Sequence, residues 1–478
     1  MNFLLVLCWS VVRAIIVCSF ATPIFVSLRN RILQPHSTTT AARWLSAMAV
    51  APLFMPDLLL GFTYRLASAG FDFSEVATEL LYATILLAKA VAIQIVCHWL
   101  VPPSNVSSSA IHLWKMSAQT SVKSRLALIR MKLAGPNRSI TIGWILGALW
   151  CFQEFETAAL LQIEQYPIAW TVWLFDAKAA NEPLVSCLQY ALPAIMIQGL
   201  LIAACAIALR GGSSNSPQHG NTVLPSGKAS FAIWQSLSVM TIAIGFLLTI
   251  FWPIALHSVA GINGLWKLGV TGTFRLGLEQ IGKSGLVAIL SAVASWKLSR
   301  WLFKTKSWRL GLMAIMPGLL SPLVLSLLLL GLFLTPVVRM VYDSWIPLIV
   351  AQTLWLLPRA FLLNVAVART VCSEQTHAAD LLKTSNDRKI QSNAHHLNWR
   401  LEQRPIWFAV TVLVVLAFWE VTISSILHPV SLQPMVCRLY REMHFGHTEV
   451  LAGLTALSVI FPLLALAIGA QIWKLVRQ

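Results

Sequence analysis

The sequence predicts an all-α polytopic membrane protein with about eleven transmembrane helices, arranged as two parallel five-helix repeats plus one extra linking helix. Composition is the first observation behind this prediction. Of the 478 residues, 57% are hydrophobic and only 11% are charged, whereas a soluble globular domain carries roughly 25% charged residues. The second observation is that the apolar residues gather into long runs, each close to the roughly 20 residues with which a helix crosses a bilayer.

Eleven such runs follow one another along the chain. The first one differs from a secretory signal peptide, because Arg13 interrupts it and no basic segment precedes it, so we expect it to be a span. The runs lie near 3–27, 44–66, 79–100, 140–162, 186–209, 232–256, 284–301, 310–333, 346–367, 406–427 and 450–473.

The net charge of +17 is gathered in alternate connecting segments. The segment 101–139 carries six Lys or Arg and no Asp or Glu, whereas 67–78 carries Asp72 and Glu75 and no Lys or Arg. Positively charged loops stay in the cytoplasm. We therefore expect a plasma (inner) membrane protein whose N-terminus is outside and whose C-terminus is cytoplasmic, with the long segments 101–139 and 368–405 both cytoplasmic. Membrane topology explains the positive charge better than nucleic-acid binding does.

The layout of the spans repeats along the chain. "EFETAALL" (Glu154–Leu161) and "EVTISSIL" (Glu420–Leu427) each end a span that follows a long cytoplasmic segment. Two five-span repeats in direct tandem would be inverted, but the additional span near 232–256 restores the direction. The expected organisation is a first unit at 1–210, a polar cytoplasmic linker at 211–230, and a second unit at 231–478 that holds the extra span and five core spans.

One cytoplasmic stretch, "SEQTHAADLLKTSNDRK" (Ser373–Lys389), has the charge pattern of an amphipathic helix. By its pattern alone, such a helix could simply rest on lipid headgroups. Part of it, "HAADLLKTS" (His377–Ser385), resembles the EAA-type loop of binding-protein-dependent ABC importer permeases of the MetI-like fold. "FWEVTISSILHP" (Phe418–Pro429), "RLYREMHFG" (Arg438–Gly446) and "FQEFETAALL" (Phe152–Leu161) resemble neighbouring regions of the same family.

The resemblance implies a function and a set of docking residues. In that family the loop forms a coupling helix that docks on a cytoplasmic ATPase, and two permease units fused in one chain are similar to the ferric-iron importers. His377 and Lys383 stand where the family has Glu and Gly, and the first-half counterpart is inferred from position, so we expect two unequal docking loops. The implied docking residues are His377, Ala378, Ala379, Asp380, Leu381, Leu382 and Lys383 in the second half, and Ala110, His112 and Leu113 in the weaker first-half loop.

The resemblance also implies partners. These are two cytoplasmic ABC ATPase subunits, a periplasmic substrate-binding protein and membrane lipid. The substrate would be ferric iron or another small ion, passed across the membrane. Two alternatives stay open, which are a secondary transporter driven by a proton or sodium gradient and a membrane scaffold that transports nothing.

Three glutamates, Glu154, Glu156 and Glu420, are expected within or at the ends of spans. An ionised group inside hydrocarbon is costly, so such residues face a cavity, a partner or water. They could line a pathway for a cation or brace helix packing by hydrogen bonds.

No residue pattern predicts catalysis. The eight Cys are scattered without a CxxC or Cys/His spacing, so we expect neither a metal site nor a disulfide framework. The stretch "GLEQIGKS" (Gly277–Ser284) matches the letters of the GxxxxGK[ST] pattern but enters the apolar run 284–301, and ATP hydrolysis is expected in a separate partner chain, as the resemblance implies. We expect a transport subunit that is not an enzyme and has no cofactor.

Overall fold

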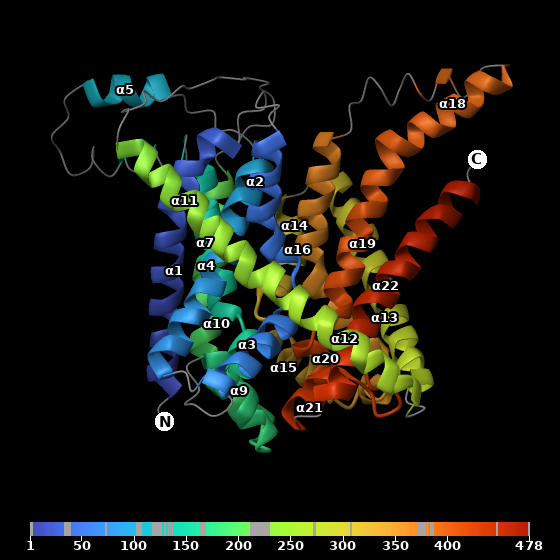
Figure 1. Cartoon of the computed structure of the whole chain (residues 1–478). Helices are drawn as coiled ribbons and strands as arrows, with labels where there is room; N and C mark the ends of the chain where they lie inside the picture. The colour runs from blue at the N-terminus through green and yellow to red at the C-terminus, as the bar shows by residue number, and fades with distance from the viewer. Residues whose placement is uncertain are drawn as a thin grey trace. The chain divides into compact units, whose positions relative to one another are not determined.

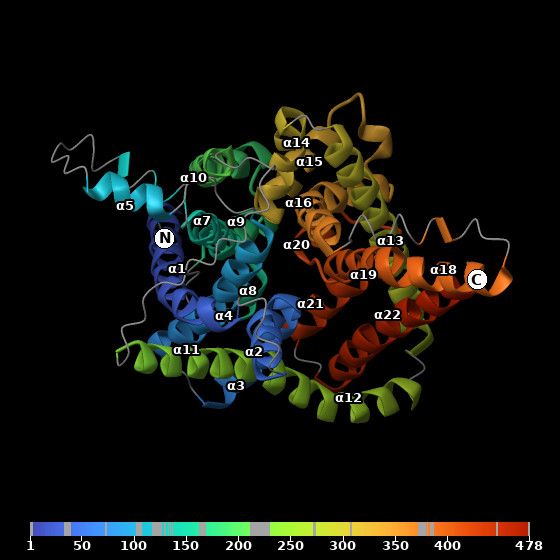
Figure 2. The ribbon, with the colours of Figure 1, turned by 90° about the horizontal axis from the view of Figure 1, so that it is seen from above.

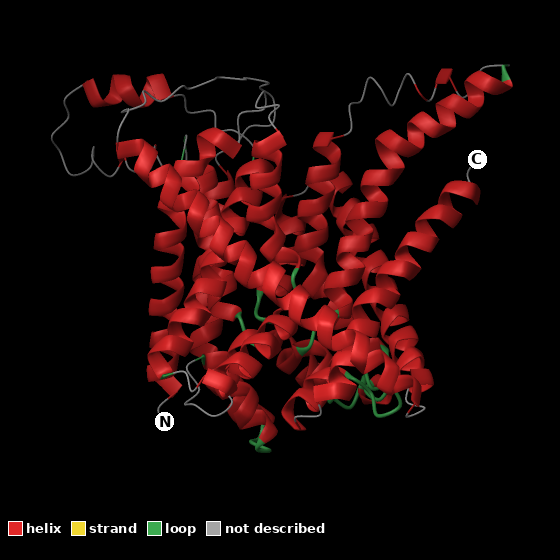
Figure 3. Cartoon of the chain, viewed as in Figure 1, coloured by secondary structure: helices red, strands yellow, loops and turns green. Residues whose placement is uncertain are grey.

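A computed structural model of the chain describes most of its residues, and every element among them is a helix (Figure 3). In the described part, seven helices are long and apolar enough to cross a membrane, or up to nine if each of two sharply bent helix pairs is one span. The chain is thus an all-α polytopic membrane protein. The described residues are 3–32, 40–71, 74–101, 108–116, 127–128, 131, 133, 135, 137–161, 169–210, 230–270, 274–305, 308–370, 379, 381–382, 387–445 and 448–476.

Packing divides the chain into two compact units, Met1–Ile254 and Ala255–Gln478. The boundary lies inside the linking helix, which runs from α11 (Ser230–Phe246) into α12 (Trp252–Val270), and not at the polar segment 211–230. The reason is that the first half of this helix packs in the first unit, where the Ser27 and Ser238 hydroxyl oxygens lie 2.5 Å apart. The organisation expected from the repeat of spans, with a second unit from 231, stays a prediction.

The first unit is built around three helices, α1, α4 and α7, which pack against one another (Figures 1 and 2). Helices α10 and α11 cover this core, and the short helices α3 and α8 pack together. The bounds are α1 Phe3–Ile32, α2 Thr40–Val50, α3 Asp57–Phe71, α4 Glu75–Leu100, α5 Ser108–Met116, α7 Arg138–Gln153, α8 Glu156–Leu161, α9 Trp170–Ala179, α10 Leu184–Arg210 and α11 Ser230–Phe246.

The second unit has a core of the same kind, made by α13, α16 and α19, with the short helices α15 and α20 packed together beside it. Helix α12 approaches α22 closely, because a Cβ at Gly261 would lie 2.9 Å from the Cβ of Ala456. The bounds are α12 Trp252–Val270, α13 Phe274–Thr305, α14 Trp308–Ile315, α15 Pro322–Phe333, α16 Ile346–Thr370, α18 Arg388–Asn398, α19 Arg404–Phe418, α20 Thr422–Leu427, α21 Met435–Phe445 and α22 Thr448–Val476.

Four of the eleven predicted runs are not single helices. The run 44–66 bends by 85° between α2 and α3, and the run 310–333 bends by 105° between α14 and α15. A short 3₁₀ turn with a proline in its first turn precedes each of these bends, at Ala51–Phe54 and Met316–Leu319. Proline removes a backbone donor and limits the preceding residue, so it favours such breaks.

The other two runs break at a glutamate. Helix α7 ends at Gln153 before Glu154, and α19 ends at Phe418 shortly before Glu420. Two of the eleven runs fall outside the seven to nine candidate spans. The run 140–162 does so because its helix α7 has only 16 residues. The run 450–473 does so because only part of α22 is described in full. The count of eleven remains a prediction.

Gly318 marks a close helix contact in the second unit. A Cβ at this position would lie 2.6 Å from Pro358 Cδ on α16 and would also press against the Leu354 carbonyl. We expect Gly318→Ala to lower the free energy of unfolding by about 1–3 kcal/mol through overpacking. The matched control is Gly311→Ala on α14, where no atom lies within 4 Å of the added Cβ.

The control should keep or raise stability, by up to about 1 kcal/mol, because alanine favours a helix over glycine. Unfolding in mixed detergent micelles measures both variants. Equal stability of Gly318→Ala and Gly311→Ala would contradict the close approach of the turn to α16.

Candidate functional site

Glu154 sits at the break between α7 and α8 and is buried. Its side chain turns forward over the start of α8. Oε1 accepts a hydrogen bond from the Thr157 backbone N–H at 2.6 Å, and Oε2 accepts one from the Ala158 N–H at 3.2 Å. The first N–H groups of a helix have no partner within the helix, and a negative charge there also interacts favourably with the helix dipole. Glu154 is therefore the cap of a helix that begins inside the protein.

Glu420 makes the same arrangement at the break between α19 and α20, and it is also buried. Its two carboxylate oxygens accept from the Ile423 N–H at 2.9 and 2.8 Å, and Oε2 also accepts from the Ser424 N–H at 3.2 Å. In both units the bonded amides are thus the third and fourth residues after the glutamate.

This geometry bears on the two roles considered for the glutamates. Both carboxylates are engaged by backbone donors, which supports the bracing interpretation. Glu156 differs from them, because it is half-buried and lies in the first turn of α8, where an acidic residue is favourable.

Tyr82 on α4 ties the Glu154 cap to the core of the first unit. Its hydroxyl donates to Glu154 Oε2 at 2.6 Å. The Arg13 guanidinium of α1 lies 4.9 Å from the Tyr82 ring centroid and forms a bidentate pair with Glu79, at 2.5 and 3.1 Å. Two helices of the first unit, α1 and α4, are therefore linked to Glu154 through one chain of polar contacts.

A second ion pair holds the proline bend of the first unit. Lys89 on α4 pairs with Asp57, the first residue of α3, and donates to the Met55 carbonyl at 3.1 Å. The Thr157 hydroxyl of α8 lies 3.4 Å from both the carbonyl and the carboxylate Oδ1 of Asp57. The bend and the glutamate cap are thus linked through Thr157.

The second unit holds its short helix with different side chains. The Gln352 amide nitrogen of α16 donates to the Ala417 carbonyl at 3.2 Å and to the Ser424 hydroxyl at 3.4 Å. Arg359, also on α16, donates to the Trp355 carbonyl at 2.6 Å and interacts electrostatically with Glu420. Side chains of α16 thus contact the residues around the second break, whereas Tyr82 of the first unit donates directly to the glutamate.

The predicted docking loops are described in part. In the first unit α5 is a helix that lies across the direction of the long helices at one end of that unit (Figure 1). His112 is exposed and Leu113 is 68% exposed. Ala110 belongs to α5, but the position of its side chain lies outside the description.

In the second unit only Ala379, Leu381 and Leu382 of the predicted docking loop are described, and all three are helical. Ala379 is buried, whereas Leu381 is 60% and Leu382 44% exposed. The leucines, and not the alanine, therefore present apolar surface. His377, Ala378, Asp380 and Lys383 lie outside the described residues.

Sequence reasoning found the glutamates but missed most of their neighbours. Lys89 lies in an apolar run, and nothing in the sequence around it indicates that Asp57 is its partner. The available signal was an acidic residue directly after Pro56, because aspartate and proline are both common at helix starts. Among the described residues, no group of three or more His, Cys, Asp or Glu is placed to hold a metal ion.

Comparison with known proteins adds no relative to this picture. No family model, no curated protein and no solved structure matches the chain.

Proposed function

We propose that this chain is the permease subunit of an ATP-driven ABC importer, built from two repeats that face the same way across the plasma membrane. The observation that carries the proposal is the shared construction of the two units. Each has a three-helix core, a sharply bent helix pair, and a buried glutamate that caps a short helix after a break. These three shared structural features support an internal repeat more strongly than the weak sequence similarity of the two halves does.

The position of the docking loops supports the same proposal. The helix α5 precedes α7 in the first unit, and residues 379–382 precede α18 and α19 in the second. Each loop therefore comes just before the helix that ends at the capped glutamate. In the second unit the chain is helical without interruption from Arg388 to Phe418.

A mechanism follows from this connection. ATPase subunits that bind ATP would draw the two loops together, and the helices after the loops would carry the movement into the membrane. The glutamate caps and their partners keep each short helix fixed to its core, so that a unit moves as a body. The coupling residues carry out no chemistry.

The substrate and the partners rest on the family resemblance. We propose ferric iron or another small ion as substrate, delivered on the outer side by a binding protein. In this proposal the N-terminus is outside and the C-terminus is cytoplasmic, in agreement with the distribution of Lys and Arg among the loops.

One observation favours the alternative of a secondary transporter. In the linked polar groups of the first unit, three carboxylates (Asp57, Glu79 and Glu154) accompany two cations (Arg13 and Lys89). A surplus carboxylate can hold a proton or a sodium ion. The backbone and tyrosine donors around Glu154 offset this surplus without a further ion, so the importer remains the better supported function.

Affinity purification tests the proposal. The tagged full chain, solubilised gently from its native membrane, should carry a cytoplasmic ATPase, and substrate uptake should stop when ATP is depleted. Uptake that survives ATP depletion and stops with a protonophore, with no ATPase in the purified sample, would support the secondary transporter instead.

The docking surface gives a sharper prediction. We expect the double variant Leu381→Glu and Leu382→Glu to lower recovery of the ATPase at least about tenfold, because apolar anchors of an interface each contribute on the order of 2 kcal/mol. The matched control is Leu397→Glu, an exposed leucine on α18 outside the predicted docking loop. Quantitative mass spectrometry of the purified complex gives the ratio. Equal recovery with the double variant and the control would place the docking surface elsewhere.

A further inference from the structure

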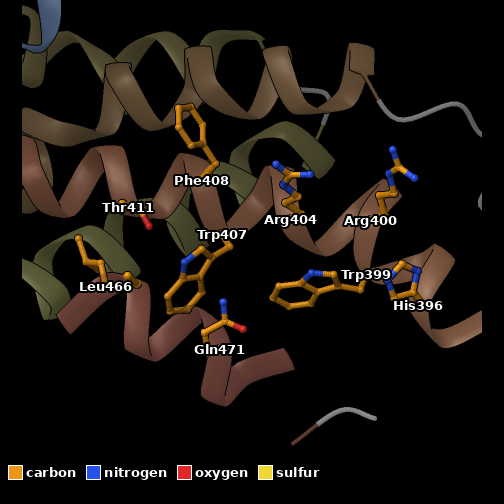
Figure 4. A pocket seen from close by; sticks show the side chains of 10 residues that line it. His396, Trp399, Arg400, Arg404, Trp407, Phe408, Thr411, Leu466 and Gln471 are labelled. Carbon is orange, nitrogen blue, oxygen red and sulfur yellow. The ribbon is translucent and has the colours of Figure 1, made fainter. Parts of the chain in front are cut away.

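The second unit contains a pocket of about 600 Å³ between the helical stretch that runs from α18 into α19 and the final helix α22. Figure 4 shows its residues spread along both walls, with the Trp399 and Trp407 rings on the side that faces Gln471. The pocket is separate from the glutamate cap and from the predicted docking leucines. It is lined by His396, Trp399, Arg400, Arg404, Trp407, Phe408, Thr411, Leu466, Ala467 and Gln471.

The lining changes character along the helix. His396, Arg400 and Arg404 occupy the N-terminal part, and Phe408 and Thr411 follow one and two turns later. Leu466 and Ala467 of α22 face the apolar part. The pocket is thus basic at one end and apolar at the other, with an aromatic middle.

One candidate membrane span gives the depth of the basic and apolar ends of the pocket in the membrane. The candidate span Gln391–Phe418 begins with the basic part of the pocket and continues into its apolar part. Arginine and tryptophan near the end of a span lie at the level of the lipid headgroups. The basic end therefore lies at the headgroups, and the apolar end reaches toward the acyl chains.

The charges of the pocket are not compensated within it. No acidic residue lines it, Arg400 and Arg404 are exposed, and neither forms an ion pair with a described residue. A ligand that fits needs an anionic group for the arginines and an apolar body.

We propose that this pocket binds one anionic phospholipid. The phosphate contacts Arg400 and Arg404, and the acyl chains lie against Trp407, Phe408 and Leu466. A free phosphate would use only the basic end, and it would leave Phe408, which is 62% exposed, without a partner. The apolar half of the pocket is thus the reason to assign a lipid and not a soluble anion. The assignment does not depend on the proposed transport function.

Photolabelling of the purified full chain tests the assignment. A phosphatidylglycerol with a photoreactive acyl chain, present at limiting concentration, should label peptides that contain Trp407–Thr411 and Leu466–Gln471. The variant with Arg400→Gln and Arg404→Gln should lose labelling at these peptides about thirtyfold, because each basic residue near a membrane surface contributes a factor of about five. The charge-matched control, with Arg300→Gln and Arg441→Gln, removes two exposed arginines of the same unit that do not line the pocket, and it should label as the wild type does.

Three competitors distinguish an anionic lipid from a neutral lipid and from a free anion. Unlabelled phosphatidylglycerol should displace the probe, whereas phosphatidylcholine and millimolar inorganic phosphate should not. Displacement by inorganic phosphate would overturn the lipid assignment in favour of a free anion, and equal displacement by phosphatidylcholine would overturn the role of the arginines. A thermal unfolding midpoint for each variant shows that a loss of labelling does not come from unfolding.

Discussion

Replacing Glu154 with alanine is expected to lower the free energy of unfolding by about 3–5 kcal/mol. The carboxylate accepts from three buried donors, the Thr157 and Ala158 amides and the Tyr82 hydroxyl. Each buried donor that loses its partner costs about 1–3 kcal/mol, and hydrogen bonds to charged groups lie at the upper end. Glu154 is buried, so water has little access to replace the lost acceptor. Unfolding by denaturing detergent in mixed micelles, followed by circular dichroism, measures the change.

Three further variants show whether the cap itself is responsible. Tyr82→Phe removes one of the three donors and should cost about 1 kcal/mol. Glu75→Ala removes an exposed glutamate from the first turn of α4 and should leave stability unchanged. Glu420→Ala should behave like Glu154→Ala, since it loses the backbone bonds of the corresponding cap. Wild-type stability of both glutamate variants would show that these caps do not hold the short helices.

The second large effect is expected at Lys89. Lys89→Met should destabilise the protein by about 3–5 kcal/mol, because it leaves the Asp57 carboxylate without its cation. The double variant with Asp57→Asn should recover most of this loss, since no uncompensated charge remains. The same unfolding experiment on the wild type, both single variants and the double variant gives the coupling free energy. Additive effects of the two substitutions would rule out a direct pairing between Lys89 and Asp57 in the membrane.

The sequence predicted the membrane class and the two unusual glutamates, because both are local signals. Long apolar runs and isolated carboxylates are visible in any short window of residues. The glutamates were also aligned with each other from the pattern around them, and the structure gives both the same capping geometry.

The helix breaks and the partners of the charges were not predicted, for physical reasons. An apolar window averages over a bend, so Pro52 and Pro56 did not divide the run 44–66. A polar contact such as Arg13 with Glu79 joins residues 66 positions apart, and Thr157 with Asp57 joins residues 100 apart. Which of several charges meet is decided by how the helices pack, and a single sequence does not contain that information.

The central claim is that the two units face the same way, with both docking loops in the cytoplasm. Its most direct test uses single cysteines in a cysteine-free chain, Leu113→Cys in the first loop and Leu382→Cys in the second. Both positions are exposed and accept a membrane-impermeant maleimide. We predict that both cysteines are labelled in inside-out vesicles and that neither is labelled in right-side-out vesicles. Labelling of the two positions from opposite sides of the membrane would mean inverted units, and it would contradict the importer architecture.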